Sequence, residues 1–224
     1  MGRSSNQVRR CAYHHGDLMR AIRDSALKFI AIRGTAEFTM RELASNIGVT
    51  HGAIYSHFKN KQALLEDLTL TNLRVLHERQ QKSIEGCQHG LEVLERLALA
   101  YTDFALSQPG AYRLIFNIND LSSESPATAM QRKTAASLTV KAIGDAQQKK
   151  LIVSGSNDVL AFTLWSAIHG LSHLLLSEHV GQFELAARDI DYTIHYAIHR
   201  HLCGVATTQG RTWLAGRIEL QTAL

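Results

Sequence analysis

The stretch that decides the fold is residues 39–61, which read TMRELASNIGVTHGAIYSHFKNK. Its first four residues have the form of a capping box. In this motif the hydroxyl of Thr39 accepts a hydrogen bond from a free amide of the first helical turn, and the carboxylate of Glu42 accepts one from the amide of Thr39. A short helix is therefore predicted to begin here and to end at Gly48, because glycine readily adopts the left-handed backbone that closes a helix.

A second short helix is predicted directly after this turn. Thr50 is placed to cap it, and the helix is expected to end near Phe58. Ile54 and Phe58 lie four residues apart and should point inward with Val49, which leaves most of residues 50–57 nearer the solvent. Two short helices joined by a turn of about three residues are typical of a helix-turn-helix, although any helical hairpin can show this spacing.

The flanking segments continue the helical pattern. Upstream, a helix from about 16 to 33 places Leu18, Ile22 and Ala26 on one apolar stripe, and downstream Asn60 can cap a long helix over 61–84. Further helices are predicted at 91–107, 110–118, 126–149, 157–179 and 184–202. No segment shows the sustained two-residue alternation of a β-strand, so the sequence predicts an all-α fold.

Charge separates the first part of the chain from the rest. Residues 1–64 hold ten Lys or Arg against four Asp or Glu, a net charge of +6, whereas the remaining residues carry −2. A basic excess confined to one segment is the electrostatic footprint of a module that binds a polyanion, joined to a nearly neutral body. A solvated surface with no such partner can show the same imbalance.

Cysteine usage and hydropathy indicate a cytoplasmic protein. The three cysteines are Cys11, Cys87 and Cys203; they are widely spaced and are expected to be free thiols in a reducing compartment. The longest segment without a charged residue, 159–177, contains too many polar groups for a membrane span, and the first residues lack the apolar run of an export signal. We expect neither a membrane partner nor export.

Residues 38–65 resemble the N-terminal signature of TetR/AcrR-family repressors, and the match extends over about 16–66. The shared features are a Thr that opens the second helix, Leu-Ala and Gly-Val around the turn, Tyr and Phe three apart, and Lys with Leu-Leu at the start of the fourth helix. The resemblance implies a ligand-released transcriptional repressor that binds a near-palindromic double-stranded operator as a homodimer, with no catalytic activity and no cofactor.

The resemblance also implies the division of the chain. It suggests a basic N-terminal arm (1–15), a helix-turn-helix DNA-binding domain (16–60), a helical ligand-binding and dimerisation domain (61–204) and a C-terminal tail (205–224). The sequence leaves the order of this tail open.

Carried over by position, the resemblance assigns two kinds of DNA contact. The residues expected to contact phosphates are Thr50, Tyr55, His57 and Lys61, and those expected at base edges are Arg41, His51, Gly52 and Ala53. Hydroxyl, imidazole and ammonium groups can donate to phosphate oxygens, and an arginine can present two donors to guanine. Further backbone or minor-groove contacts are expected from the arm, at Arg9, Arg10 and 13–15.

The effector half is expected to bind a small molecule among aromatic and amphipathic side chains. The segment 165–170 resembles the Trp-His-Gly segment of one TetR branch. The candidate ligand residues are Tyr101, Phe104, Tyr112, Phe116, Met130, Trp165 and His169. Core packing is the competing interpretation of each.

The resemblance implies dimerisation through the last two long helices, here those near 157–179 and 184–202, and their apolar stripes have spacings that suit helix packing. The stripes consist of Leu164, Ile168, Leu171, Leu174 and Leu175 on the first and Ile190, Ile194, Ala197, Ile198 and Leu202 on the second. The competing interpretation is that these stripes face the core of a single chain.

Two rival functions remain open. His169 with His173, and His195 with His199, have the four-residue spacing of helical metal ligands, which would suit a metal-dependent enzyme. Neither pair has an evident third ligand, so we predict no metal site. The other rival is a ligand-binding protein whose helix-turn-helix is vestigial.

Overall fold

The computed structural model of the protein describes residues 15–117, 125–183, 185 and 187–221. Over this part of the chain it confirms the all-α fold: the residues form α-helices and one short 3-10 helix, η2 (Glu178–Gln182). Within the same ranges, the extended pairing consists of a single bridge between Ile152 and Ala206. The basic arm, apart from the start of the first helix at His15, lies outside the described residues.

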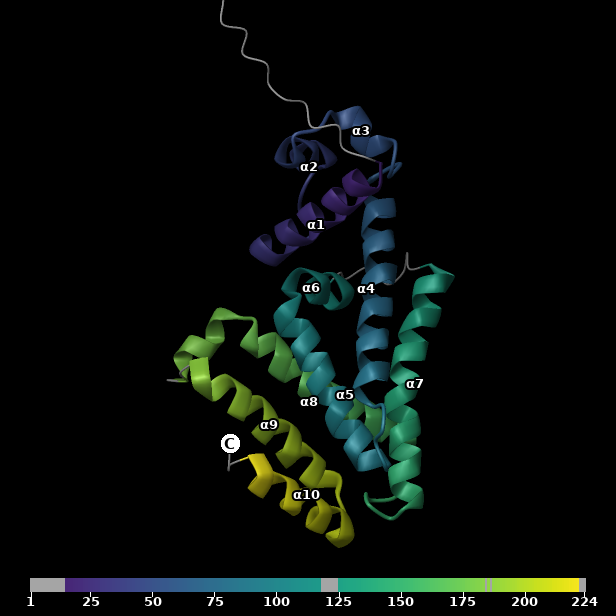
Figure 1. The fold of residues 1–224 in the computed structure, drawn as a ribbon, viewed down its shortest axis with the longest axis vertical. Helices are drawn as coiled ribbons and strands as arrows, with labels where there is room; N and C mark the ends of the chain where they lie inside the picture. Colours follow the sequence, from purple (N-terminus) through teal and green to yellow (C-terminus); the bar gives the residue numbers. More distant parts are fainter. Residues whose placement is uncertain (1–14, 118–124, 184, 186, 222–224) are drawn as a thin grey trace, which may run out of the picture.

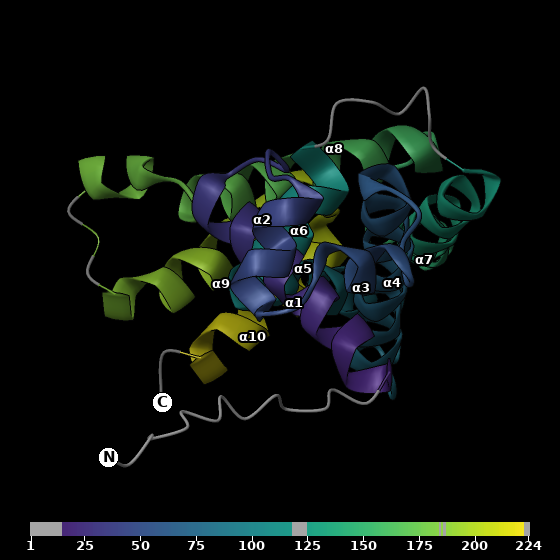
Figure 2. The same ribbon diagram turned by 90° about the horizontal axis from the view of Figure 1, so that it is seen from above.

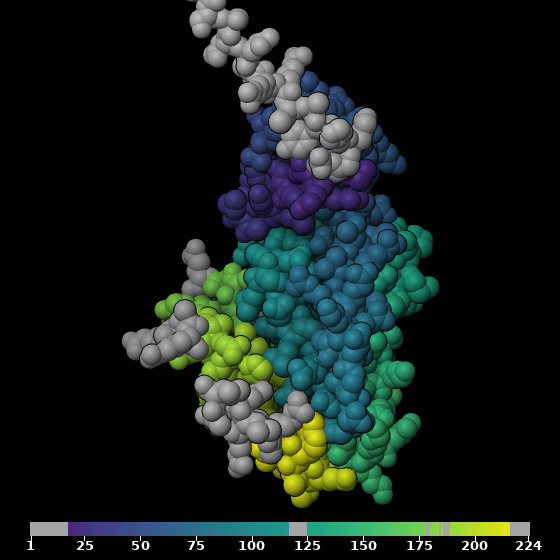
Figure 3. All heavy atoms as spheres, in the orientation of Figure 1, coloured from purple at the N-terminus to yellow at the C-terminus, as the bar shows by residue number. Residues whose placement is uncertain are grey.

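Three helices form a lobe at one end of the molecule (Figure 1; Figure 3), which we call the N-terminal lobe. They are α1 (His15–Arg33), α2 (Met40–Ile47) and α3 (His51–Tyr55). The capping box is present, because the amide of Glu42 donates to Thr39 Oγ1 over 3.1 Å and the amide of Thr39 donates to Glu42 Oε2 over 2.6 Å. Gly48 closes α2 in the left-handed region, with φ at +77°.

Helix α3 is shorter than the sequence predicted. It ends at Tyr55 instead of near Phe58, because the chain tightens into a turn in which the amides of His57 and Phe58 both donate to the carbonyl of Ile54. Asn60, whose backbone is extended, then caps α4 (Lys61–Ser83) by accepting from the amide of Ala63 over 2.8 Å. The turn still carries the ring of Phe58 into the interior.

A small core holds the N-terminal lobe together and joins it to α4. It contains buried side chains from all three helices of the lobe, from the start of α4 and from Leu114 of α6. Polar contacts fix the same arrangement: Arg23 of α1 donates to both carboxylate oxygens of Asp67 on α4, over 2.8 and 2.9 Å. The lobe is therefore attached to the body along α4 and also through α6.

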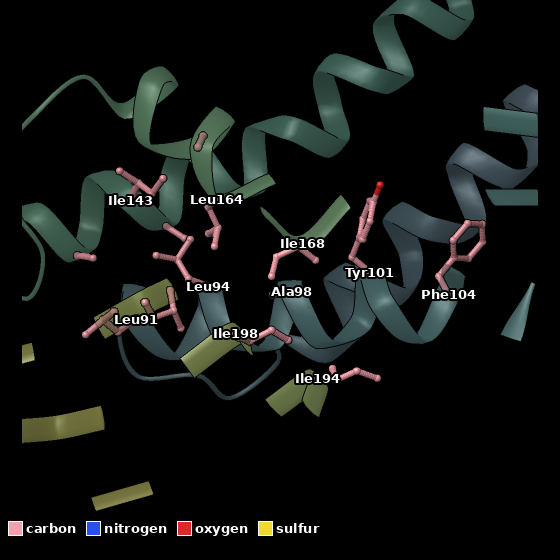
Figure 4. Close-up of a cluster of buried hydrophobic side chains, with 14 of the residues drawn as sticks. Leu91, Leu94, Ala98, Tyr101, Phe104, Ile143, Leu164, Ile168, Ile194 and Ile198 are labelled. Atoms are coloured by element: carbon pink, nitrogen blue, oxygen red, sulfur yellow. The ribbon is translucent and has the colours of Figure 1, made fainter. Parts of the chain in front are cut away.

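The remaining helices form the body around a second core. They are α5 (Gly90–Ser107), α6 (Pro109–Asn117), α7 (Pro126–Gln148), α8 (Asn157–Leu175), α9 (Ala187–Val205) and α10 (Thr208–Gln221). Helices α7 and α9 lie on opposite sides of the body in both ribbon views (Figure 1; Figure 2). Figure 4 shows side chains of α5, α7, α8 and α9 meeting in this core.

The described part of the C-terminal tail, whose order the sequence left open, is helical and packed on the body. Residues 208–221 form α10, and Leu214 is fully buried in the body core. The ring of Trp213 meets His89 edge-on at a centroid distance of 4.3 Å, and the amide of Thr207 donates to the carbonyl of Leu151. These contacts bury apolar surface that a free tail would leave in water.

Across the described residues, none of the helices combines the length and apolarity needed to cross a membrane.

Candidate functional site

The outer face of α3 is formed by the residues expected to meet DNA. Ile54 is fully buried beneath it and Phe58 is buried beside it, as predicted, while His51 and Gly52 are exposed. Tyr55 is 44% exposed although it is a large aromatic side chain. The helix is thus held from below by apolar packing and presents small and polar groups to the solvent.

Local contacts fix the orientation of this face. Thr50 Oγ1 accepts from the amide of Ala53 over 3.3 Å, so this hydroxyl caps α3. The ring of His51 lies edge-on to Tyr55, with centroids 4.7 Å apart. Arg41 is exposed on α2, and His57 is half-buried in the turn after α3. These contacts thus join His51 to Tyr55 and Thr50 to Ala53, while Arg41 lies on the neighbouring helix α2.

Lys61 lies beneath the edge of this surface. Its ammonium is 4.8 Å from the centre of the Phe38 ring, and the side chain is half-buried at the first position of α4. This cation–π contact holds the charge near the N-terminus of α4. Two further exposed residues, Ser56 and Lys59, lie next to the predicted set. Sequence reasoning counted Lys59 only in the basic excess and gave neither residue a role.

In the body, the predicted ligand residues meet around His169 of α8, in what we call the His169 cluster. The hydroxyls of Tyr101 and Tyr112 lie 2.9 and 3.0 Å from His169 Nδ1, and the Tyr112 hydroxyl also donates to the His169 carbonyl over 3.1 Å. The rings of Phe116 and Trp165 lie 5.2 and 5.1 Å from the imidazole. Three helices, α5, α6 and α8, supply these five side chains.

The His169 cluster is uncharged near neutral pH. Burial raises the pKa of Tyr112 to about 12 and raises that of Tyr101 further, whereas burial and the neighbouring His173 lower the pKa of His169. A neutral imidazole offers one lone pair. Since Tyr112 can donate to the carbonyl, we assign the donor to Nδ1 as Tyr101, which leaves the ring proton on Nε2.

Two predicted ligand residues lie outside the His169 cluster. Phe104 is fully buried, and the guanidinium of Arg79 lies 5.6 Å from the centre of its ring. Met130 is 65% exposed on α7. Spacing alone could not separate these two from the residues that meet at His169, because helical packing places Tyr101, Tyr112 and His169 together across long sequence separations.

The apolar stripes predicted for dimerisation face mainly the interior of the same chain. Leu164 and Ile168 of α8, and Ile198 of α9, are buried and point toward Leu94 and Ala98 of α5 (Figure 4). The exposed apolar side chains on these helices and their connection include one residue of the predicted stripes, Leu174 at 52%, together with Val159 61%, Phe162 64%, Trp165 40%, Phe183 64%, Leu185 40%, Tyr192 61% and Tyr196 50%. We call this set the outer apolar face of α8 and α9.

The two histidine pairs lie on α8 and α9, and the structure gives each histidine a neighbour. His169 and His173 are stacked with ring centroids 6.4 Å apart, Cys203 Sγ lies 3.7 Å from the His199 ring nitrogens, and His195 Nε2 lies 3.9 Å from Asp191. Among the residues that the structure describes, no group of three His, Cys, Asp or Glu is placed to hold a metal ion.

The neutrality of His169 leads to a pH dependence of stability. Because its folded-state pKa lies below 6.5, the unfolded chain binds more protons as the pH falls through that value, and stability decreases. We expect His169→Gln, which keeps an acceptor for Tyr101, to reduce the loss of unfolding free energy between about pH 7 and 5 in urea titrations. His201→Gln should remove a separate part of the same loss of stability, since burial also lowers the pKa of His201. An unchanged profile for His169→Gln would contradict this assignment.

Comparison with known proteins matches both halves of the chain. Residues 22–68 match the family model described as bacterial regulatory proteins of the tetR family, and residues 94–201 match that of the tetracyclin repressor-like C-terminal domain. The HTH-type transcriptional repressor KstR2 of Mycolicibacterium smegmatis is 32% identical over 75 residues. That match spans 34% of this chain and 37% of the length of the repressor.

Solved structures share the fold over most of the chain. A protein of unknown function from Rhodococcus sp. RHA1 is 25% identical, with a TM-score of 0.72, covering 88% of this chain and all of the other. AibR, in complex with isovaleryl coenzyme A and operator DNA, is 19% identical, with a TM-score of 0.66, covering 80% and 96%. With both its N-terminal and C-terminal halves matched, the chain belongs to the TetR family of bacterial regulatory proteins.

Proposed function

We propose that this protein is a cytoplasmic transcriptional repressor that binds operator DNA as a homodimer and releases it when a small molecule binds the body. The observation that carries the proposal is the exposed, polar face of α3 held on the buried side chains of Ile54 and Phe58. The name of KstR2 as a repressor, and the operator and coenzyme A ester bound by AibR, support the same type of regulator. Members of this family are generally regulators and not enzymes.

In the DNA complex, α3 enters the major groove. Gly52 and Ala53 bring the backbone close to base edges, His51 and Arg41 supply donors to them, and Tyr55 donates to phosphate. No charged residue lies within α3. Nonspecific attraction therefore depends on surrounding basic groups, among them Lys59 and Lys61.

The second copy of the chain covers the outer apolar face of α8 and α9. An apolar face of this extent is unfavourable in water, and a symmetric contact through one patch is the commonest way in which chains associate. Pairing also places two copies of α3 on one duplex, where half-sites about 34 Å apart face the same side. In this dimer the contact is made by the exposed apolar side chains of α8 and α9, and not by the residues of the predicted stripes that are buried in the chain's own core.

The effector contacts the His169 cluster. Its rings provide apolar walls, its hydroxyl and imidazole groups are neutral, and the contacts that define it involve no Lys or Arg side chain. A carboxylate or phosphate placed here would lose its hydration without gaining a counter-charge. The part of the ligand that reaches His169 is therefore an uncharged hydroxyl or carbonyl on an apolar body. Met130 and Phe104 take no part in this contact.

DNA binding is tested by selecting bound fragments from random duplexes and measuring variants by fluorescence anisotropy. Tyr55→Phe and Lys61→Ala should weaken binding to all sequences, and Lys61→Ala should lower the salt slope by about one. Arg41→Ala should in addition relax base preference at one position, at a cost of about 1–3 kcal/mol. Lys133→Ala, exposed on α7, is the matched control. If binding is neither salt-sensitive nor sequence-selective, the proposal is wrong, and the rival of a ligand-binding protein with a vestigial helix-turn-helix is favoured.

Dimerisation is tested by charging the outer apolar face. Phe162→Asp with Tyr192→Asp should convert the protein to a monomer in sedimentation, because burying an unpaired carboxylate in an apolar contact costs more than the roughly 2–7 kcal/mol of a neutral polar group. Met130→Asp changes a side chain of nearly equal exposure, 65% against 64% for Phe162, and should remain dimeric. A double variant that still sediments as a dimer would exclude this face as the interface.

The effector class is tested by screening compounds for operator release. Matched pairs on one aromatic skeleton, such as 2-acetylnaphthalene and 2-naphthoate, should release DNA in the uncharged form only. His169→Phe, which removes the ring proton assigned to Nε2, should weaken the active compounds about fivefold, the effect of one lost hydrogen bond of about 1 kcal/mol. Met130→Leu should leave release unchanged. Stronger release by the carboxylates would contradict a neutral site.

A further inference from the structure

Arg113 of α6 joins the N-terminal lobe to the end of α8. Its Nη1 donates to the carbonyl of Ala31 in the last turn of α1, and its Nη2 donates to the carbonyl of Leu176 over 3.0 Å. Leu176 is the C-cap of α8. One half-buried guanidinium therefore contacts the C-terminal ends of two helices that lie in different parts of the molecule.

The chemistry of these contacts favours arginine. The last carbonyls of a helix have no partner within the helix and carry partial negative charge. A planar guanidinium has separate donors fixed in a fork, so it can satisfy two such carbonyls at once, whereas a lysine ammonium has a single nitrogen. The bridge depends on both helix ends keeping their positions relative to α6.

Helix α6 also packs directly on α1. A Cβ atom built at Gly110 would collide with the carbonyl oxygen of Leu27, so glycine is needed for this close approach. Leu114, on the next turn of α6, is buried in the core of the N-terminal lobe. Gly110, Arg113 and Leu114 thus fix α6 against the DNA-binding half.

Tyr112, the residue before Arg113 on α6, belongs to the His169 cluster. Tyr112 is fully buried, and its hydroxyl lies against both Nδ1 and the carbonyl of His169. Consecutive residues of one short helix therefore contact the effector cluster and the lobe that carries α3. A ligand that displaced His169 would therefore also displace Tyr112 and, with it, Arg113.

We propose that Arg113 is a positioning residue that couples the His169 cluster to α1, so that a change at either site is transmitted through α6 in addition to the covalent path along α4. This inference rests on the proposed function, since it concerns how DNA and effector sites influence each other. By thermodynamic reciprocity, DNA binding then changes the affinity for the effector, and we expect it to alter the surroundings of the His169 cluster as well.

The reciprocal effect allows a test that needs no effector. The chain has two tryptophans, Trp165 and Trp213. In a Trp213→Phe protein, Trp165 is the sole tryptophan, and its ring lies 5.1 Å from His169. Its emission is recorded while the selected operator duplex is added, and binding is followed separately by anisotropy of a label on the DNA.

The parent should show an emission change that saturates with binding. Arg113→Met, which keeps the apolar stem but loses the donors, should bind the duplex and lose that change. Arg132→Met is the matched control, because Arg132 of α7 also donates to a carbonyl of α6, that of Ile115, over 2.9 Å. It should keep the emission change.

The outcomes separate the two proposals. A parent that binds no duplex overturns the proposed function, whereas a parent that binds without an emission change overturns the coupling alone. An unaltered emission change in Arg113→Met also overturns it. If Arg113→Met does not fold, Arg113→Lys replaces it, with a reduced emission change expected at saturating duplex and an undiminished one counting against the role of Arg113.

Discussion

The structure depends first on the burial of Ile54 and Phe58 beneath the short helix α3. A helix of five residues is not stable by itself, because its hydrogen bonds do not offset the entropy of ordering the chain. Burial of two such side chains contributes about 1.5–3 kcal/mol each, and the cap from Thr50 adds about 1 kcal/mol. The exposed face of α3 keeps a fixed shape because its opposite face is anchored in this way.

Sequence predicted the local features of the N-terminal lobe well. Capping residues, the left-handed Gly48 and the inward pair of α3 depend on contacts within a few residues, so their patterns can be interpreted without the fold. The end of α3 was predicted too late because Phe58 keeps the helical spacing while the backbone tightens into a turn. α10 was missed because its order comes from contacts with distant residues, including His89 and Leu151.

Non-local packing also explains what could not be predicted in the body. The aromatic residues were identified from sequence, but their division into the His169 cluster and the remainder depends on how α5, α6 and α8 cross. For the same reason, the spacing of apolar residues along α8 and α9 could not decide which stripe of each helix faces the core. Both helices are apolar on two sides, and only the fold shows that Ile168 and Ile198 are inside while Phe162 and Tyr192 are outside.

Helix α6 lies between the two halves of the molecule, with the face of α3 at one end and the outer apolar face of α8 and α9 on the flank. The regulatory role depends on contact between the face of α3 and the duplex. Amide hydrogen exchange of the full chain, with and without selected duplex, measures this contact directly. We expect slowed exchange concentrated in residues 50–56 and the start of α4. Protection confined to α7 or to the outer face of α8 and α9, with α3 unaffected, would contradict it.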